Sequence, residues 1–210
     1  MPSIRAFIAI ESSREVLDLL ARIQARLRTG PGGEAGRWVR PETAHLTVKF
    51  LGDVPSERIS AIGKAMDATC AQHGPFMLQV AGLGCFPNTR RPRVVWVGVR
   101  EETGALLKLQ HELERALDAL GFPREQRPFE PHLTLARVRE SVSRVCEAVS
   151  RLDVEALGQS VAAQRESTNQ ILAQMQVSEL TLFKSDLRPE GPLYTPLYRS
   201  PLKSESTNHS

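Results

Sequence analysis

Several features that would assign the chain to a familiar class are absent. No apolar run approaches the roughly 20 residues of a membrane-spanning helix, and the opening MPSIRAFIAIE reaches Glu11 too early for a signal peptide. The three cysteines, at positions 70, 85 and 146, include no C-x-x-C pair. We therefore expect small buried cysteines, with neither a disulfide framework nor a zinc knuckle. These absences predict a cytoplasmic protein with no membrane partner.

Common motifs of cofactor chemistry are also missing. The stretch GLGCF (82–86) contains G-x-G but no third glycine and no following helix, so it is not a dinucleotide fingerprint. The sequence contains no P-loop and no G-x-S-x-G, and its histidines never show the H-x-x-x-H spacing of a zinc site. We expect neither a cofactor nor a metal ion.

The composition is that of a soluble globular protein, with 210 residues, 41% hydrophobic and 24% charged. The net charge of +3 is too small to indicate a nucleic-acid partner. However, only five of the 27 basic residues are lysines. Arginine's planar guanidinium suits phosphate better than the ammonium group of lysine does, although a genome of biased base composition explains the same excess.

Hydrophobic periodicity predicts an α+β fold built from two halves. In each half a strand carrying histidine and threonine is followed by a helix and two more strands, which indicates two pseudo-symmetric lobes of antiparallel sheet with helices packed outside. We expect one bilobal domain over 1–200 and a flexible tail over 201–210. The predicted strands are 5–10, 45–51, 76–83, 93–99, 132–138, 176–185 and 193–199, and the predicted helices are 16–27, 55–74, 104–120 and 141–157.

The segments HLTVKFL (45–51) and HLTLARV (132–138) share an unusual pattern. Side chains two positions apart on a strand share a face, so His45 and Thr47 lie together, as do His132 and Thr134. The intervening leucines point to the core. One such segment is ordinary, because sheet faces exposed to solvent are commonly polar. Its recurrence in both halves indicates a shared site.

Two imidazoles and two hydroxyls around one anion suit phosphodiester hydrolysis without a metal. With an ordinary pKa of about 6.5, one histidine ring can be neutral while the other is protonated. A neutral ring can take a proton from water, and a protonated ring can donate one to a leaving oxygen. Threonine hydroxyls can stabilise the charge that develops on the phosphate oxygens. The residues alone leave open which histidine plays which part.

The sequence resembles the two-histidine phosphoesterase superfamily. The resemblance is to its RNA 2′,3′-cyclic phosphodiesterase branch, which is also called 2′-5′ RNA ligase-like. The similarity lies in the two H-x-T-x motifs, HLTV and HLTL, and in their surroundings. It covers most of the chain outside 158–172 and the tail. The matching stretches are RAFIAIE, RWVRPETAHLTVKFLGD, RPFEPHLTLARV and LTLFKSDLRPEGPLYTPL.

The resemblance implies a bilobal fold with an active-site groove between the lobes. It also implies that a 2′,3′-cyclic phosphate at an RNA end, tRNA fragments included, is opened to a 2′-phosphomonoester. By motif position His45 would be the proton donor to the departing 3′ oxygen, and His132 would be the proton acceptor that activates water. Thr47 and Thr134 would hold the phosphate. We expect the enzyme to be a monomer.

Four further residues are weaker candidates for substrate binding. By strict alternation Lys49 shares the face of His45. Arg137 could reach the phosphate only if its strand ends or bulges after Thr134. Arg127 lies in a loop and could guide RNA electrostatically, and Phe129, like Trp38 and Phe86, could stack a base.

Other functions fit the same residues. The catalytic pair could join RNA ends through a 2′-5′ linkage, the reverse reaction, or could act on a small cyclic nucleotide. From a different class, the chain could be a non-catalytic module that binds RNA or nucleotides. Retention of both histidines and both threonines favours an enzyme.

Overall fold

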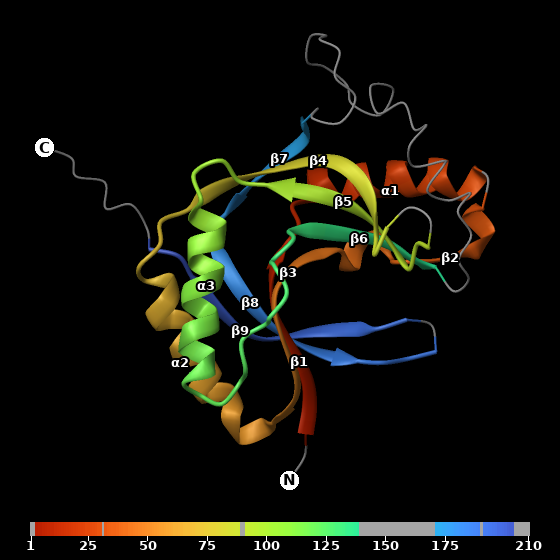
Figure 1. The fold of residues 1–210 in the computed structure, drawn as a ribbon. Helices are drawn as coiled ribbons and strands as arrows, with labels where there is room; N and C mark the ends of the chain where they lie inside the picture. The colour runs from red at the N-terminus through yellow and green to blue at the C-terminus, as the bar shows by residue number, and fades with distance from the viewer. Residues whose placement is uncertain (1–2, 31, 89–90, 139–170, 190, 204–210) are drawn as a thin grey trace, which may run out of the picture.

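A computed structural model describes residues 3–30, 32–88, 91–138, 171–189 and 191–203. In this part of the chain nine strands form one antiparallel sheet and three α-helices pack on it (Figure 1). The predicted α+β class is confirmed. The elements are β1 (Ser3–Glu11), α1 (Arg14–Thr29), β2 (Gly36–Trp38), β3 (His45–Pro55), α2 (Ile59–Cys70), β4 (Phe76–Phe86), β5 (Val94–Arg100), α3 (Ala105–Asp118), β6 (His132–Val138), β7 (Ile171–Val177), β8 (Glu179–Asp186) and β9 (Leu193–Pro201).

The two motif strands, β3 and β6, are neighbours at the centre of the sheet. The strand order is β7-β4-β5-β6-β3-β1-β8-β9, with β2 attached to β6. One residue pair, Leu46 with Leu133, joins β3 to β6. The two halves of the sheet therefore meet where the middle residues of the two HLT motifs lie opposite each other.

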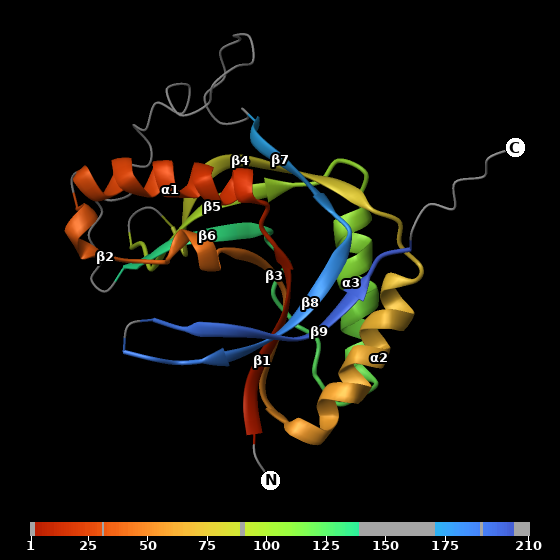
Figure 2. The same cartoon turned by 180° about the vertical axis from the view of Figure 1, so that it is seen from behind.

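The helices cover the two halves separately. Helices α2 and α3 contact each other and lie against β8, β9 and β3, while α1 contacts β7 of the other half. Figure 2 shows this separation from behind, with α1 far from the α2–α3 pair. Because α1 follows β1 but packs on the opposite half, the order of elements along the chain ties the two halves together.

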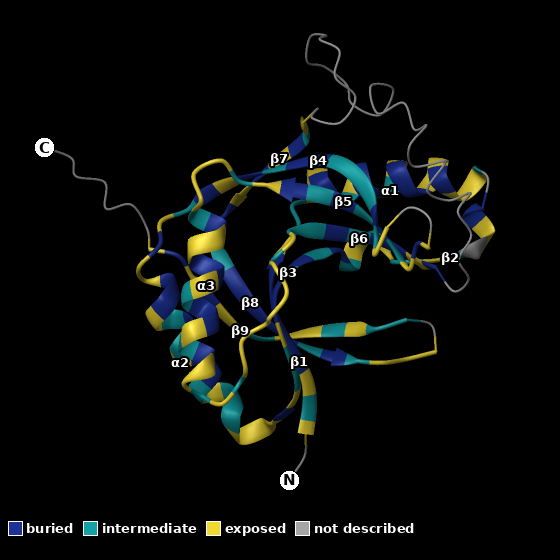
Figure 3. Cartoon of the chain, viewed as in Figure 1, coloured by how far each residue is buried: buried dark blue, intermediate teal, exposed yellow. Residues whose placement is uncertain are grey.

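One apolar core runs through both halves. Leu46 and Leu133 are almost completely buried in it, and α1 contributes Leu20 and Ile23 while α3 contributes Leu113. In Figure 3 the buried residues lie on the inner side of the helices and along the central strands. Each such aliphatic side chain contributes about 1.5–3 kcal/mol when it leaves water. The core thus fixes the junction of the motif strands.

Several predicted boundaries need correction. The strand predicted over 176–185 belongs to two strands, β7 and β8. Pro201 ends β9 and Leu202 is buried in the core, so the tail predicted from 201 begins too early. The predicted helix over 141–157 and residues 204–210 lie outside the described residues.

The two cysteines among the described residues differ in state. Cys85 is disulfide-bonded, so the prediction of unpaired cysteines is wrong for this residue, whereas Cys70 is a buried free thiol. Position 146 lies outside the described residues.

No helix in the described part of the chain has the length and apolar character needed to cross a membrane.

Both motif strands carry a β-bulge directly after the threonine. Along β3, Thr47 pairs with Ala9 and Lys49 with Ile8, which leaves Val48 as an extra residue. Along β6 the pairing with β5 skips Leu135 in the same way. A bulge reverses the alternation of side chains beyond it.

The bulge in β3 buries Lys49. The Lys49 Nζ donates to Glu114 Oε2 of α3 at 2.6 Å and to the Pro123 carbonyl oxygen at 2.6 Å. Glu114 also accepts from the Glu125 backbone N–H at 3.2 Å. The exposed fractions of the Lys49 and Glu114 side chains are 5% and 6%. This ion pair therefore anchors the loop that leads from α3 into β6.

Removing one charge of this pair is expected to destabilise the fold. Replacing Lys49 with alanine leaves Glu114 buried without its cation, which costs about 3–5 kcal/mol in free energy of unfolding. Urea denaturation measures the loss. As a control, Asp18→Asn breaks the exposed Arg14–Asp18 pair, for which we expect about 1 kcal/mol or less. Equal losses in the two variants would contradict the assigned role of Lys49.

Candidate active site

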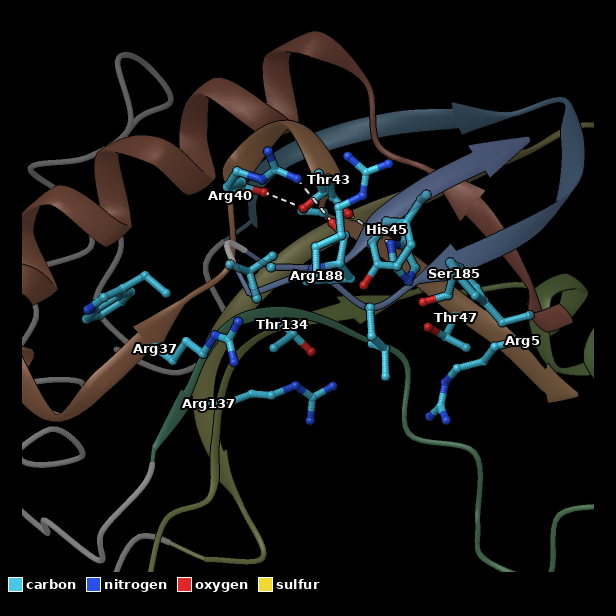
Figure 4. Close-up of a pocket in the computed structure, with 18 of the residues that line it drawn as sticks. Arg5, Arg37, Arg40, Thr43, His45, Thr47, Thr134, Arg137, Ser185 and Arg188 are labelled. Carbon is cyan, nitrogen blue, oxygen red and sulfur yellow. Dashed lines mark hydrogen bonds between the residues drawn. The ribbon is translucent and has the colours of Figure 1, made fainter. Parts of the chain in front are cut away.

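A cavity of about 550 Å³ lies where the halves of the sheet meet, and all four motif side chains line it. His45 and Thr47 come from β3, and His132 and Thr134 come from β6. Continuing the antiparallel register from the Leu46–Leu133 pair places each histidine opposite the threonine of the other strand. Residues of β1, β2 and the β8–β9 hairpin complete the walls (Figure 4). The structure thus brings the predicted quartet together.

The two histidines are held in the same way. The Nδ1 of His45 lies 2.9 Å from the carbonyl oxygen of Thr43, and the Nδ1 of His132 lies 2.7 Å from that of Glu130. A carbonyl oxygen only accepts, so each Nδ1 carries a hydrogen. In a neutral ring the other nitrogen, Nε2, then holds the lone pair. Each ring can therefore accept a proton at Nε2 or, when charged, donate one.

Aromatic rings fix the imidazole planes. Phe7 stacks on His45 with centroids 4.7 Å apart, and Tyr194 meets the same ring edge-on at 5.1 Å. Phe86 meets His132 edge-on at 4.9 Å. Phe86, which we expected to stack a base, thus contacts the catalytic candidate itself. Such packing restricts each ring to one orientation.

Burial lowers the pKa of His45 from its ordinary value of 6.5. The hydrogen bond to the Thr43 carbonyl and the charge of Glu11 act in the opposite direction, and the charge of His132 adds to the lowering. Glu11 lies opposite His45 in the β1–β3 pairing. In the free protein the neutral form of His45 is therefore favoured, and Glu11 limits this preference.

The charge of the cavity is strongly positive. Its described lining contains no aspartate or glutamate. Among the described residues, no group of three or more histidine, cysteine or acidic side chains is placed to hold a metal ion. A cavity lined in this way attracts anions. Its arginines, which come from four separate stretches of chain, are Arg5, Arg37, Arg40, Arg137 and Arg188.

Two of these arginines tie the β8–β9 hairpin to the opposite wall. Arg37 donates to the Pro189 carbonyl oxygen at 3.2 Å, and Arg40 donates to that of Pro192 at 3.1 Å. The hairpin tip therefore lies across the cavity, as Figure 4 shows for Arg188.

Of the weaker candidates, the structure places Arg137 in the cavity, and Trp38, which could stack a base, lines it as well. The bulge at Leu135 turns the side chain of Arg137 to the same face as Thr134, which meets the condition under which we expected it to reach phosphate. The expectation that Lys49 shares the face of His45 is wrong, because the bulge in β3 turns its side chain to the core.

Arg127 and Phe129 lie outside the cavity. The side chain of Arg127 is 87% exposed and pairs with Glu125 at 3.5 Å. Phe129 packs against the core, and both residues line a separate groove beside α3. Hydrogen bonds from Lys49 to Pro123 and from Glu125 to Glu114 hold the start of this loop on the α3 side.

Sequence reasoning missed several residues of the site. Phe50, with 50% of its surface exposed, takes the position on β3 that Arg137 takes on β6. Both follow their threonine by three positions, and this shared spacing was a usable signal. The other arginines were not identifiable, because nothing local to them marks the cavity.

Comparison with known proteins agrees with the geometry. The family model described as LigT like Phosphoesterase matches twice, over residues 10–96 and 97–194. An RNA 2′,3′-cyclic phosphodiesterase of Methanothermobacter thermautotrophicus is 34% identical over 194 residues, covering 91% of this chain and 95% of that protein. One of Archaeoglobus fulgidus is 33% identical over 193 residues, covering 92% and 97%.

Solved structures share the fold. The protein TT0787 of Thermus thermophilus superposes with a TM-score of 0.74 at 27% identity, over 96% of this chain and 100% of that one. E. coli LigT complexed with 3′-AMP gives a TM-score of 0.69 at 27% identity, over 96% and 99%. The doubled family match also agrees with the two pseudo-symmetric halves.

The electrostatics of His45 can be tested directly. We expect its pKa, followed by NMR titration of the imidazole, to lie below 6.5 because the ring is buried. Glu11→Gln removes a charge that favours the imidazolium, so the pKa falls further. Glu15→Gln, on the surface of α1, is the control and leaves it unchanged. A pKa at or above the ordinary value, or one indifferent to Glu11, would contradict this account.

Proposed function

The chain belongs to the LigT-like phosphoesterase family, and on this basis we propose that it hydrolyses 2′,3′-cyclic phosphodiester ends of RNA to 2′-phosphomonoesters without a metal ion. The observation that carries the proposal is the convergence of two Nε2-presenting histidines and two threonine hydroxyls on one arginine-lined cavity. The names of the relatives point to the same substrate.

In the proposed reaction, water attacks the phosphorus of the cyclic phosphate while the bond from phosphorus to the 3′ oxygen breaks. His132 Nε2 accepts a proton from the attacking water, and His45 Nε2 donates one to the departing 3′ oxygen. The 2′ oxygen keeps the phosphate. Each positioned acid or base contributes typically about 10²–10⁴-fold to such a rate.

The non-bridging oxygens gain charge as the water attacks. Thr47 and Thr134 can donate hydrogen bonds to them from the two strands, and Arg137 can add a charged donor beside Thr134. Donors fixed on strands need no rearrangement when the charge develops.

Burial, the largest influence on His45, lowers its pKa, and Glu11 opposes this effect in the direction that a proton donor needs. A donor must be protonated when substrate is bound, and Glu11 favours that form. The negative charge of a bound phosphate acts in the same direction. In the free protein burial outweighs Glu11 and favours the neutral ring, so protonation of His45 would be coupled to the arrival of an anion.

The decisive assay is hydrolysis of a short oligonucleotide with a 2′,3′-cyclic phosphate end, in the presence of EDTA. We expect wild type to release a 2′-phosphate, and His45→Ala and His132→Ala each to lose at least about 10²-fold in kcat. His111→Ala, on the exposed face of α3, is the matched control. A 3′-phosphate product would reject the proposed roles of the histidines, and absence of turnover by wild type would reject the activity.

Arg137, which follows the bulge in β6, allows a separate test of the proposed phosphate contacts. Arg137→Gln removes a charged donor from the cavity, so we expect kcat to fall by about 10²-fold, as for loss of one oxyanion donor. Arg127→Gln makes the same change in charge outside the cavity and should retain wild-type activity. Similar losses in both variants would mean that general electrostatics, and not the position of Arg137, matters.

A further inference from the structure

The cavity holds more positive charge than its proposed chemistry uses. A cyclic phosphodiester carries a single negative charge, and the two threonines and Arg137 already provide donors to it. Arg37 and Arg40 donate to carbonyl oxygens of the hairpin tip. This leaves Arg188, on the hairpin, and Arg5, on β1, without a role in the reaction, although both line the same cavity.

Arg5 is placed as a ligand-binding residue would be. It is exposed, and among the described residues it forms no ion pair, although Asp53 is its register partner across β3. Instead its guanidinium carbon lies 4.7 Å from the centre of the Phe50 ring. A cation held over an aromatic face keeps its charge and most of its N–H donors. The ring therefore orients the guanidinium without neutralising it.

The position of Arg5 separates it from the other phosphate-binding candidates. In Figure 4 Arg5 and Thr47 lie at one side of the cavity, while Arg37, Thr134 and Arg137 lie at the other. Arg5 and Phe7 are two positions apart on β1, and Phe7 stacks on His45. Along β1, Arg5 therefore lies two residues beyond Phe7, the ring that stacks on His45, and at the end of the cavity where Phe50 lies.

We infer that Arg5, supported by Phe50, is a subsite for a second phosphate, attached to the 5′ oxygen of the nucleoside whose cyclic phosphate reacts. The inference rests on the proposed function. It assigns the substrate class: the site takes RNA ends with a preceding phosphate in preference to a cyclic mononucleotide. The shared chemistry is a 5′ phosphate, whether internucleotide or terminal.

Binding of product-like ligands tests the subsite without turnover. Calorimetry compares adenosine 2′-phosphate with the dinucleotide ApA carrying the same 2′-phosphate, and with its uncharged methylphosphonate analogue. We expect Arg5→Gln to weaken binding of the charged dinucleotide about tenfold, the contribution of one charge-assisted hydrogen bond. Binding of the other two ligands should not change. Arg14→Gln, which removes an exposed arginine of α1, is the control.

Results that would reject the Arg5 subsite differ from results that would reject the proposed hydrolysis. Equal effects of Arg5→Gln on the charged and uncharged dinucleotides, or no effect on either, would overturn the subsite. So would a wild type that binds the charged dinucleotide no better than the mononucleotide. Arg5→Lys keeps the charge but not the planar guanidinium, so it should bind the charged dinucleotide more weakly than wild type and more tightly than Arg5→Gln, a graded loss that a folding defect would not give. Adenosine 2′,5′-bisphosphate shows whether a terminal phosphate suffices. Failure of hydrolysis would reject the proposed function and leave these binding results valid.

Discussion

The pairing of Leu46 with Leu133 is the contact on which the site depends. It is the residue pair through which the two halves of the sheet join, and both side chains are fully enclosed in the core. Because side chains alternate along a strand, burying the middle residue of each HLT motif turns its histidine and threonine to the opposite face. One apolar contact thus sets the positions of four polar groups on two distant parts of the chain.

The paired bulges then make the two halves chemically different. Each adds one residue after the threonine and brings the third following residue to the cavity, phenylalanine in β3 and arginine in β6. The same bulge in β3 sends Lys49 into the core, where it meets Glu114 and anchors the loop before His132. A near-symmetric framework therefore presents an aromatic surface at one end and a guanidinium group at the other.

Electrostatics links these features to a ligand. Backbone carbonyls hold both imidazoles with Nε2 free, and burial favours the uncharged form of His45 until an anion arrives. Arginines from β1, β2 and the hairpin surround this centre without a carboxylate among the described lining. The cavity is therefore suited to an anion before any ligand binds, and under the proposed function little reorganisation has to accompany the reaction.

The local pattern of polar and apolar residues determined much of the secondary structure and the grouping of the motif side chains. Alternation of polar and apolar residues is a property of the strand itself, so the sequence alone predicted most of the strands, though not β2 or most of β7, as well as the antiparallel α+β class and the shared faces of His45 with Thr47 and His132 with Thr134. The tertiary structure decided the rest. A bulge depends on how a partner strand pairs, so the burial of Lys49 and the exposure of Phe50 could not be read from alternation. Arg5 and Arg188 reach the cavity only through contacts between segments far apart in the chain, and local periodicity does not predict such contacts.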